Sequence, residues 1–268
     1  MKPTTPNPIS LASGVVPEFS PVDTIEAARA GGFDMVGLWV DPAEWTAGNT
    51  RDARAALSAT GLPLLDVEVI WLKPDSAMDD HRKVIDVGAE LGAANVLCVS
   101  SDPDHARTAA RLAQLCVHAE GSGMRVTLEF GIFTEVKDLR AALAVLDQVA
   151  HPLRALLIDP IHVDRSGTTI ADIAKVDPAL LPYAQFCDAP ALRPDPADFD
   201  AVIHDAINLR EQCGEGALPL AALHQALPAN IPLAIELRSQ ALRDAFPHPA
   251  LRAAAVANAT RRWLEALA

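Results

Sequence analysis

A strand signal followed by a helix signal recurs eight times, and this alternation constrains the fold more than any other feature of the chain. Apolar runs predict buried parallel strands at 9–13, 34–40, 63–70, 94–100, 125–130, 154–159, 183–187 and 231–237. Stretches that predict helices follow them at 21–30, 50–59, 79–91, 104–120, 136–149, 170–175, 198–210 and 249–267. Because eight units close a (β/α)₈ barrel, the sequence predicts one TIM barrel, an α/β fold, over residues 1–268.

An open, doubly wound sheet is the competing architecture for alternating strands and helices. It would need a glycine-rich phosphate turn after its first strand, and the segment SGVVPEF offers no GxGxxG pattern there. No Gly/Ser-rich or charge-rich linker divides the 268 residues. A single barrel domain therefore remains the prediction.

The net charge of −13 excludes some classes of partner. A nucleic-acid surface needs clustered Lys and Arg, so we expect no nucleic-acid partner. No apolar run approaches the roughly twenty residues that span a bilayer, and we expect no membrane association. The four cysteines lack CxxC spacing, which favours reduced thiols and a cytoplasmic protein. A small-molecule substrate is the partner that these features predict.

Polar side chains end four consecutive predicted strands, the fifth to the eighth. They are Glu129, Asp159, Gln185 and Glu236. Because the carboxyl ends of barrel strands meet at one rim, we expect them to lie together. Carboxylate and amide oxygens suit a hard divalent cation, and a cation would offset the repulsion among the carboxylates. Taken one at a time, each acidic residue has another interpretation, as a helix N-cap or a solvated loop group.

Further residues near the predicted rim are candidate substrate contacts. Arg165 or Arg238 could pair a substrate carboxylate or phosphate, with a solvated position as the alternative. The indole of a tryptophan after a strand covers a sugar face or packs between helix and barrel. Asp188 orients a neighbour or caps a loop, and the turn at Glu215 is a substrate loop or a plain connection. The candidates are Arg238, Asp188, Glu68, Glu215 and Trp71.

Five segments carry a specific resemblance: LEFGIF, IDPIHVDRSG, QFCDAP, CGEGALPL and IELRS. With them the chain resembles the xylose isomerase-like TIM-barrel superfamily of sugar phosphate isomerases and epimerases. The resemblance implies that Glu129, Asp159, Gln185 and Glu236 bind a divalent metal such as Mn²⁺, Mg²⁺, Co²⁺ or Zn²⁺. It also implies that Glu129 and Glu236 form the acid/base pair and that His162 touches the substrate. A loop histidine bonded to a backbone carbonyl is the other interpretation of His162.

The resemblance implies a metal-dependent isomerase or epimerase of a small sugar, sugar phosphate or hydroxy-keto acid. The metal would stabilise an enediolate while one glutamate removes a proton and the other returns it. A dehydratase on the same scaffold and a non-catalytic sugar- or metal-binding barrel are the alternatives. Gln185 departs from the ketose 3-epimerases, which generally have His there, and is closer to hydroxypyruvate isomerase. Endonuclease IV is similar only in the barrel, because the histidines here are scattered. The closing segment 249–267 leaves a homo-oligomer possible.

Overall fold

The computed structural model describes residues 7–267. Its core is one sheet of eight parallel strands in the order β6-β5-β4-β3-β2-β1-β8-β7. The strands are β1 (Ile9–Leu11), β2 (Met35–Trp39), β3 (Leu64–Leu72), β4 (Asn95–Ser100), β5 (Arg125–Glu129), β6 (Arg154–Leu157), β7 (Ala184–Phe186) and β8 (Leu233–Ile235). The predicted TIM barrel is confirmed.

Two junctions close the barrel, β1 with β8 and β6 with β7, and they differ in the regularity of their hydrogen bonds. The first and last strands form a regular ladder, in which Ile9 to Leu11 pair with Leu233 to Ile235. Between β6 and β7 the backbone N–H of Gln185 donates to the Ile158 carbonyl at 3.0 Å, without a paired ladder. This junction lies between two strands that carry predicted site residues.

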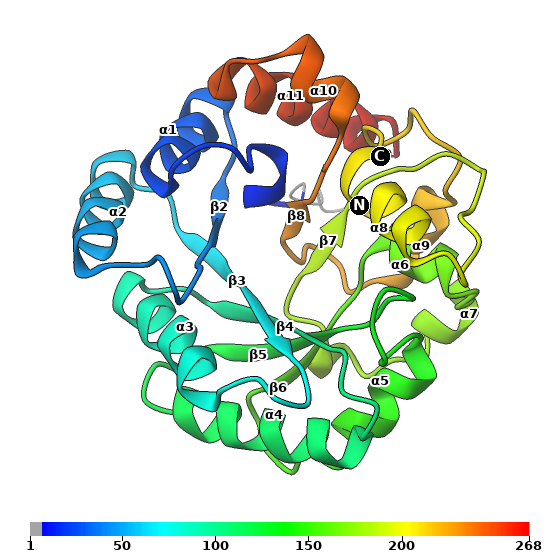
Figure 1. Ribbon diagram of the computed structural model, residues 1–268. Coiled ribbons are helices and arrows are strands. Elements are labelled where there is room, and N and C mark those ends of the chain that lie inside the picture. Colours follow the sequence, from blue (N-terminus) through cyan, green and yellow to red (C-terminus); the bar gives the residue numbers. More distant parts are fainter. Residues whose placement is uncertain (1–6, 268) are drawn as a thin grey trace.

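Helices surround the strands as an outer ring (Figure 1). They are α1 (Pro21–Gly31), α2 (Ala47–Thr60), α3 (Met78–Leu91), α4 (His105–Ala119), α5 (Leu139–Leu146), α6 (Pro160–Arg165), α7 (Ile170–Ile173), α8 (Phe199–Asn208), α9 (Leu220–Ala226), α10 (Gln240–Ala245) and α11 (Pro249–Leu267), with short 3₁₀ turns η1 (Ser13–Val15) and η2 (Pro178–Leu180). None of the helices within residues 7–267 is both long and apolar enough to cross a membrane.

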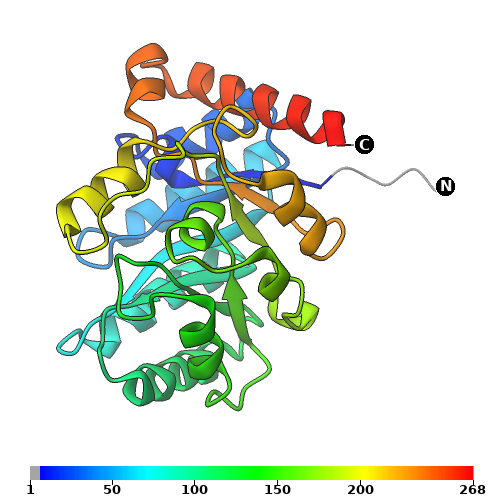
Figure 2. The same cartoon turned by 90° about the vertical axis from the view of Figure 1, so that its right-hand side faces the viewer.

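Local sequence explains where the first helix begins and ends. Ser20 and Asp23 form a capping box at the start of α1, and Gly32 ends the helix in the left-handed conformation at φ 81°. A side chain on Gly31 would collide with Ala253, which shows how closely α1 approaches α11. Figures 1 and 2 show these two helices side by side, so the last helix packs against the first.

The second half of the barrel is less regular than the sequence predicts. Three short helices, α6, α9 and α10, were not predicted, and the last three strands are shorter than the predicted runs 154–159, 183–187 and 231–237. The reason for α6 is local: Asp159 caps it through its side chain and Pro160 occupies the first helical position. The chain therefore turns into a helix at Asp159, where the sequence predicts the end of a strand. The predicted helix 249–267 is confirmed as α11.

All four cysteines are buried and unpaired, as predicted. Apolar side chains on the outer face of the strands pack against the helices in one large cluster. A second, smaller cluster includes Leu65, Leu97, Leu157, Tyr183 and Ala234. Because these residues alternate along their strands with the outward-facing set, they fill the barrel interior and provide a floor for the carboxyl end.

Candidate functional site

A pocket of about 140 Å³ opens at the carboxyl ends of the strands. Glu129 at the end of β5, Gln185 in β7 and Glu236 just after β8 line one part of it. Trp39 and Trp71 line another part. The rim predicted from the sequence therefore coincides with a cavity, as the barrel fold requires.

Two of the predicted ligands lie in a tight group with the predicted histidine. Ligand atoms of Glu129, Asp159 and His162 all lie within 4.8 Å of one another. Nε2 of His162 is 3.9 Å from Glu129 Oε1 and 4.0 Å from Asp159 Oδ2. All three side chains are buried. This spacing is suited to a shared cation or a shared proton.

Gln185 completes this group. Its amide oxygen faces Glu129 Oε1 and Asp159 Oδ2, so oxygen atoms from three strand ends converge. Only with the amide turned over does its nitrogen donate to these oxygens, at 2.9 and 3.3 Å. The first arrangement is the one that a bound cation favours, and the second compensates the carboxylates without a cation.

Asp159 uses its two oxygens for different purposes. Oδ1 accepts the Ile161 N–H at 3.0 Å and caps α6, whereas Oδ2 accepts Nη1 of Arg210 at 2.6 Å. Burial opposes the charged form, but the charge and hydrogen bond of Arg210 outweigh it and lower the pKa of Asp159. The capping interpretation and the site interpretation are therefore compatible, because each needs only one oxygen.

Glu129 is the opposite case. Burial and the charge of Asp159 raise the pKa of Glu129 well above the ordinary value. Burial also lowers the pKa of His162 to about 4, so its imidazole is neutral at pH 7. A neutral imidazole next to carboxyl groups offers either a ligand nitrogen or one N–H donor.

Glu236 lies beside this group and is held by an arginine. Nε of Arg238 donates to Glu236 Oε1 at 2.6 Å, and Oε2 is buried with no hydrogen-bond partner among residues 7–267. A side chain on Gly14 would displace the Glu236 carboxylate and the Arg238 guanidinium, so glycine in the turn η1 leaves room for this pair. Glu236 keeps one free buried oxygen beside the cluster of Glu129, Asp159 and His162, of which it is not a member.

The buried carboxyl group of Glu68 lies on the other side of the pocket. It accepts a short hydrogen bond from the Ser13 hydroxyl. Burial and the charge of Glu236 raise its pKa to about 7. Deeper in the barrel, Tyr183 donates to Asp66 at 3.2 Å, and burial with the charge of Glu68 raises the pKa of Asp66 well above its ordinary value.

The structure separates the predicted substrate contacts into two groups. Arg238, Glu68 and Trp71 line the pocket, and Trp71 stacks edge-on against Phe133 while its indole donates to Ser101. Asp188 accepts backbone N–H groups of Ala189, Gly214 and Leu218, so it organises a loop. Glu215 accepts from Gln212 and does not line the pocket. For Asp188 and Glu215 the loop interpretation is the one that these contacts support.

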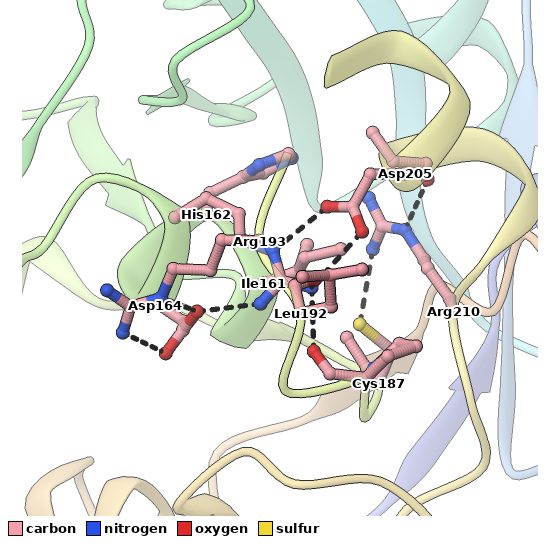
Figure 3. Close-up of polar contacts among 12 residues, drawn as sticks. Ile161, His162, Asp164, Cys187, Leu192, Arg193, Asp205 and Arg210 are labelled. Carbon is pink, nitrogen blue, oxygen red and sulfur yellow. Dashed lines mark hydrogen bonds and ion pairs between the residues drawn. The ribbon is translucent and has the colours of Figure 1, made fainter. Parts of the chain in front are cut away.

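The solvated interpretation of Arg165 is wrong. Its side chain is 2% exposed and donates to both oxygens of Asp205 and to Asp164. Figure 3 shows the Asp164 carboxylate beside Arg193, which donates two hydrogen bonds of 2.8 Å to it. Arg165 therefore fastens α6 to α8 behind the site and does not await a substrate anion.

Arg210 was not predicted from the sequence, yet it contacts the site directly. It lies after α8 and is only 5% exposed. It donates to Asp159, to the Glu236 carbonyl and, beside it in Figure 3, to the Cys187 sulfur. An arginine at the end of a predicted helix is usually solvated, so the sequence held no signal of its burial. Ser13, which donates to Glu68, and Phe133, which lines the pocket, were not predicted either.

A divalent cation fits the residues present. The oxygens of Glu129, Asp159 and Gln185 converge, and the free oxygen of Glu236 is buried beside them. Arg210 occupies one lone pair of Asp159 Oδ2 and leaves another. Hard oxygen donors with one neutral imidazole suit Mg²⁺, Mn²⁺, Co²⁺ or Zn²⁺.

A protein family described as "xylose isomerase-like TIM barrel" matches residues 25–267. No curated protein matches the chain. A xylose isomerase-like TIM barrel/4-hydroxyphenylpyruvate dioxygenase fusion protein is 20% identical with a TM-score of 0.80, over 98% of this chain and 44% of that one. The chain therefore spans less than half of that protein.

Two further solved structures match along nearly their whole length. The IOLI protein, solved with a zinc atom, is 15% identical with a TM-score of 0.77, over 97% of each chain. D-Psicose 3-epimerase from Clostridium cellulolyticum H10, solved with D-tagatose, is 13% identical with a TM-score of 0.73, over 96% of this chain and 99% of that one. At these identities the likeness shows the fold alone.

Proposed function

Because this chain belongs to the xylose isomerase-like TIM-barrel family, we propose that it is a divalent-metal-dependent isomerase or epimerase. Its substrate would be a small hydroxy-carbonyl compound that reacts through an enediolate. The observation that carries the proposal is the convergence of the Glu129, Asp159 and Gln185 side chains beside the free oxygen of Glu236. The zinc in the IOLI structure and the sugar in the epimerase structure support the same class.

Four side chains would hold the metal: Glu129, Asp159, Gln185 and Glu236, with His162 as a further donor within reach. A divalent cation there would polarise adjacent carbonyl and hydroxyl oxygens and stabilise negative charge on them. Arg210 fixes Asp159, and Arg238 fixes one oxygen of Glu236. The chain thereby orients both carboxylates before a substrate enters.

Glu129 and Glu236 are the proposed acid/base pair. They project from β5 and β8, so they approach the pocket from different strands. One carboxylate removes the carbon-bound proton, and the other returns a proton to the same or the adjacent carbon. The neutral imidazole of His162 has one N–H with which to stabilise a developing oxyanion.

A dehydratase is the second candidate, and Glu68 favours it. Its carboxyl group lines the pocket with a pKa of about 7, so near neutral pH about half of the molecules carry the acid form. Such an acid can give its proton to a hydroxyl that leaves as water.

A cytoplasmic location and assembly into a homo-oligomer remain predictions from the sequence.

Hydrogen exchange tests the proposal directly. The protein is incubated in D₂O with Mn²⁺, Mg²⁺, Co²⁺ or Zn²⁺ and a panel of hydroxy-ketones, hydroxy-aldehydes and hydroxy-keto acids. Carbon-bound deuterium in an isomeric product, seen by NMR, supports the isomerase or epimerase. Loss of water from each substrate turned over supports the dehydratase. If no metal and no compound yields deuterium or product, the barrel binds without turnover and the proposal is wrong.

A further inference from the structure

Arg238 presents unused hydrogen-bond donors to the pocket. Its Nε donates to Glu236, and its guanidinium carbon lies 5.7 Å from the centre of the Trp39 ring. Its two terminal amino groups make no hydrogen bond to any acceptor within residues 7–267. The side chain is 23% exposed and lines the pocket. A guanidinium has five N–H donors, so most of those of Arg238 remain available.

Arg210 adds a second guanidinium to the same pocket. Its Nε donates to the Ala206 carbonyl and its Nη1 to Asp159, but Nη2 has no hydrogen-bond acceptor in the part of the chain that the structure describes. Nη2 is not one of the fully buried unpaired atoms of residues 7–267, so it is accessible from the pocket and free to donate to an acceptor there. Two arginines beside one small cavity therefore indicate an anionic ligand.

The remaining lining is divided between polar and apolar parts. Its polar part consists of Glu68, Glu129, His162, Gln185 and Glu236, and no Ser, Thr, Asn or Tyr within residues 7–267 belongs to it. Its apolar part includes Trp39, Trp71, Phe133, Leu97, Val99 and Ile203. Hydroxyls of a free hexose that faced the apolar part would be buried without partners, which is unfavourable. The lining suits a compact carbon skeleton with one charged end.

The charges point to a single negative charge on the ligand. The carboxylates of Glu129, Asp159 and Glu236 face the guanidinium groups of Arg210 and Arg238. A ligand with a single carboxylate adds less negative charge beside these acids than a phosphate dianion does, so the monoanion is the one that the pocket favours. The cavity of about 140 Å³ is also close in size to an apolar cavity of about 150 Å³ that admits benzene.

We propose that the substrate is a small hydroxy or keto acid whose carboxylate binds to Arg238, with Arg210 supporting it. This inference deepens the proposed function and rests on it. The bidentate geometry of a guanidinium fits a carboxylate, and the Trp39 ring lies within cation–π distance of the Arg238 guanidinium. Sugars without an acidic group would be poor substrates.

Binding of two probes of equal shape tests this without turnover. Benzoate and benzamide are titrated into the full-length protein, once after EDTA treatment and once with Mg²⁺. Calorimetry and the fluorescence of Trp39 and Trp71 report binding. We expect benzoate to bind at least about tenfold more tightly than benzamide, as for a charge-assisted pair. Phenyl phosphate, the third probe, is expected to bind more weakly than benzoate.

Substitutions of Arg238 locate the anion. R238M should abolish the preference for benzoate, and R238K should retain part of it because the charge remains while the fork is lost. R193Q is the matched control, since Arg193 is 57% exposed and pairs with Asp164 outside this pocket. Near-ultraviolet circular dichroism verifies that each variant is folded, and R238K serves if R238M does not fold.

Equal binding of the two probes, no binding of either, or tighter binding of phenyl phosphate would overturn the inference. So would a benzoate preference that survives in R238M with Mg²⁺, because the anion would then bind elsewhere. Failure of the deuterium experiment, in contrast, leaves these binding results intact. The carboxylate site and the proposed reaction therefore fail separately.

Discussion

The two halves of the barrel rim differ in chemistry. Strands β5 to β8 end in oxygen-bearing side chains, including Glu129, Gln185 and Glu236. Strands β2 to β4 contribute rings and aliphatic groups, such as Trp39 and Trp71, with Glu68 as the one carboxyl among their lining residues. One half therefore carries the charged groups that the proposed reaction would use, and the other carries the rings and aliphatic groups that would surround the proposed substrate.

The two halves also differ in how arginines pair with their acids. Arg210 and Arg238 compensate Asp159 and Glu236 in the second half. No guanidinium forms an ion pair with Glu68 within residues 7–267, and Ser13 alone hydrogen-bonds to it. Pairing with Arg210 helps to lower the pKa of Asp159, whereas burial and the charge of Glu236 raise the pKa of Glu68 to about 7.

The largest expected effect is on activity. E129Q removes a proposed base and ligand and should lower kcat/KM by about 10³-fold or more on whichever substrate the exchange experiment identifies. E135Q is the control, since Glu135 is exposed and pairs with Lys137. Activity of E129Q within tenfold of the wild type would mean that the side chains at the ends of β5 to β8 do not carry out the reaction.

The next effect is on stability. R210M leaves the buried Asp159 carboxylate without its cation and should lower the free energy of unfolding by about 3–5 kcal/mol. Urea denaturation in EDTA measures it, with R193Q as a surface control. A loss below about 1 kcal/mol would show that Arg210 does not compensate the negative charge of Asp159.

The contribution of Glu68 to stability should decrease as the pH rises. Its pKa is raised from 4.5 to about 7, so the folded protein binds the proton more tightly than the unfolded chain. Stability should therefore fall as the pH rises from about 4.5 to about 7, by about 3 kcal/mol for this group. In E68Q the fall over this window should be smaller by that amount. Urea midpoints in EDTA at several pH values measure the difference, and parallel curves would contradict it.

Metal binding should depend on the side chains that follow strands β5 to β8 and not on Glu68 in β3. Mn²⁺ at about 100 times its dissociation constant should stabilise the wild type by about 2.7 kcal/mol. E68Q should keep this gain and E129Q should lose most of it, as measured by thermal denaturation with and without EDTA. Equal gains in both variants would place the cation elsewhere.

The smallest effect should come from the aromatic wall. W39L removes the ring beneath Arg238 and should raise KM about three- to fivefold, with kcat unchanged. Steady-state kinetics measures it. A fall in kcat instead would mean that Trp39 acts on the reaction and not on the substrate skeleton.

The sequence predicted the barrel and much of the rim. Each strand of a parallel barrel is a short apolar run followed by a helix, so the eight units were visible locally. Glu129, Asp159 and Gln185 end or follow such runs, and they do converge. The helix α6 was missed because Asp159 serves both as the end of an apolar run and as an N-cap.

The arginines were not predictable in the same way. Arg165 and Arg210 lie in or just after short helices, where solvation is usual, yet both are buried against acids distant in sequence. Asp188 and Glu215 resembled substrate contacts, but one binds loop N–H groups and the other is bonded by Gln212. Hydrophobic periodicity carries no record of such partners.

The sequence by itself determined the alternation of strands and helices and the acids at the strand ends, because both depend on residues that are neighbours in the chain. Only the tertiary structure decided which carboxyl groups pair with an arginine and which arginine N–H groups remain without an acceptor. Asp159 and Arg210 are 51 residues apart, and their pairing exists only once the barrel closes. Burial makes such pairs obligatory, since an unpaired charge in the interior is costly, and burial is a property of the folded molecule alone.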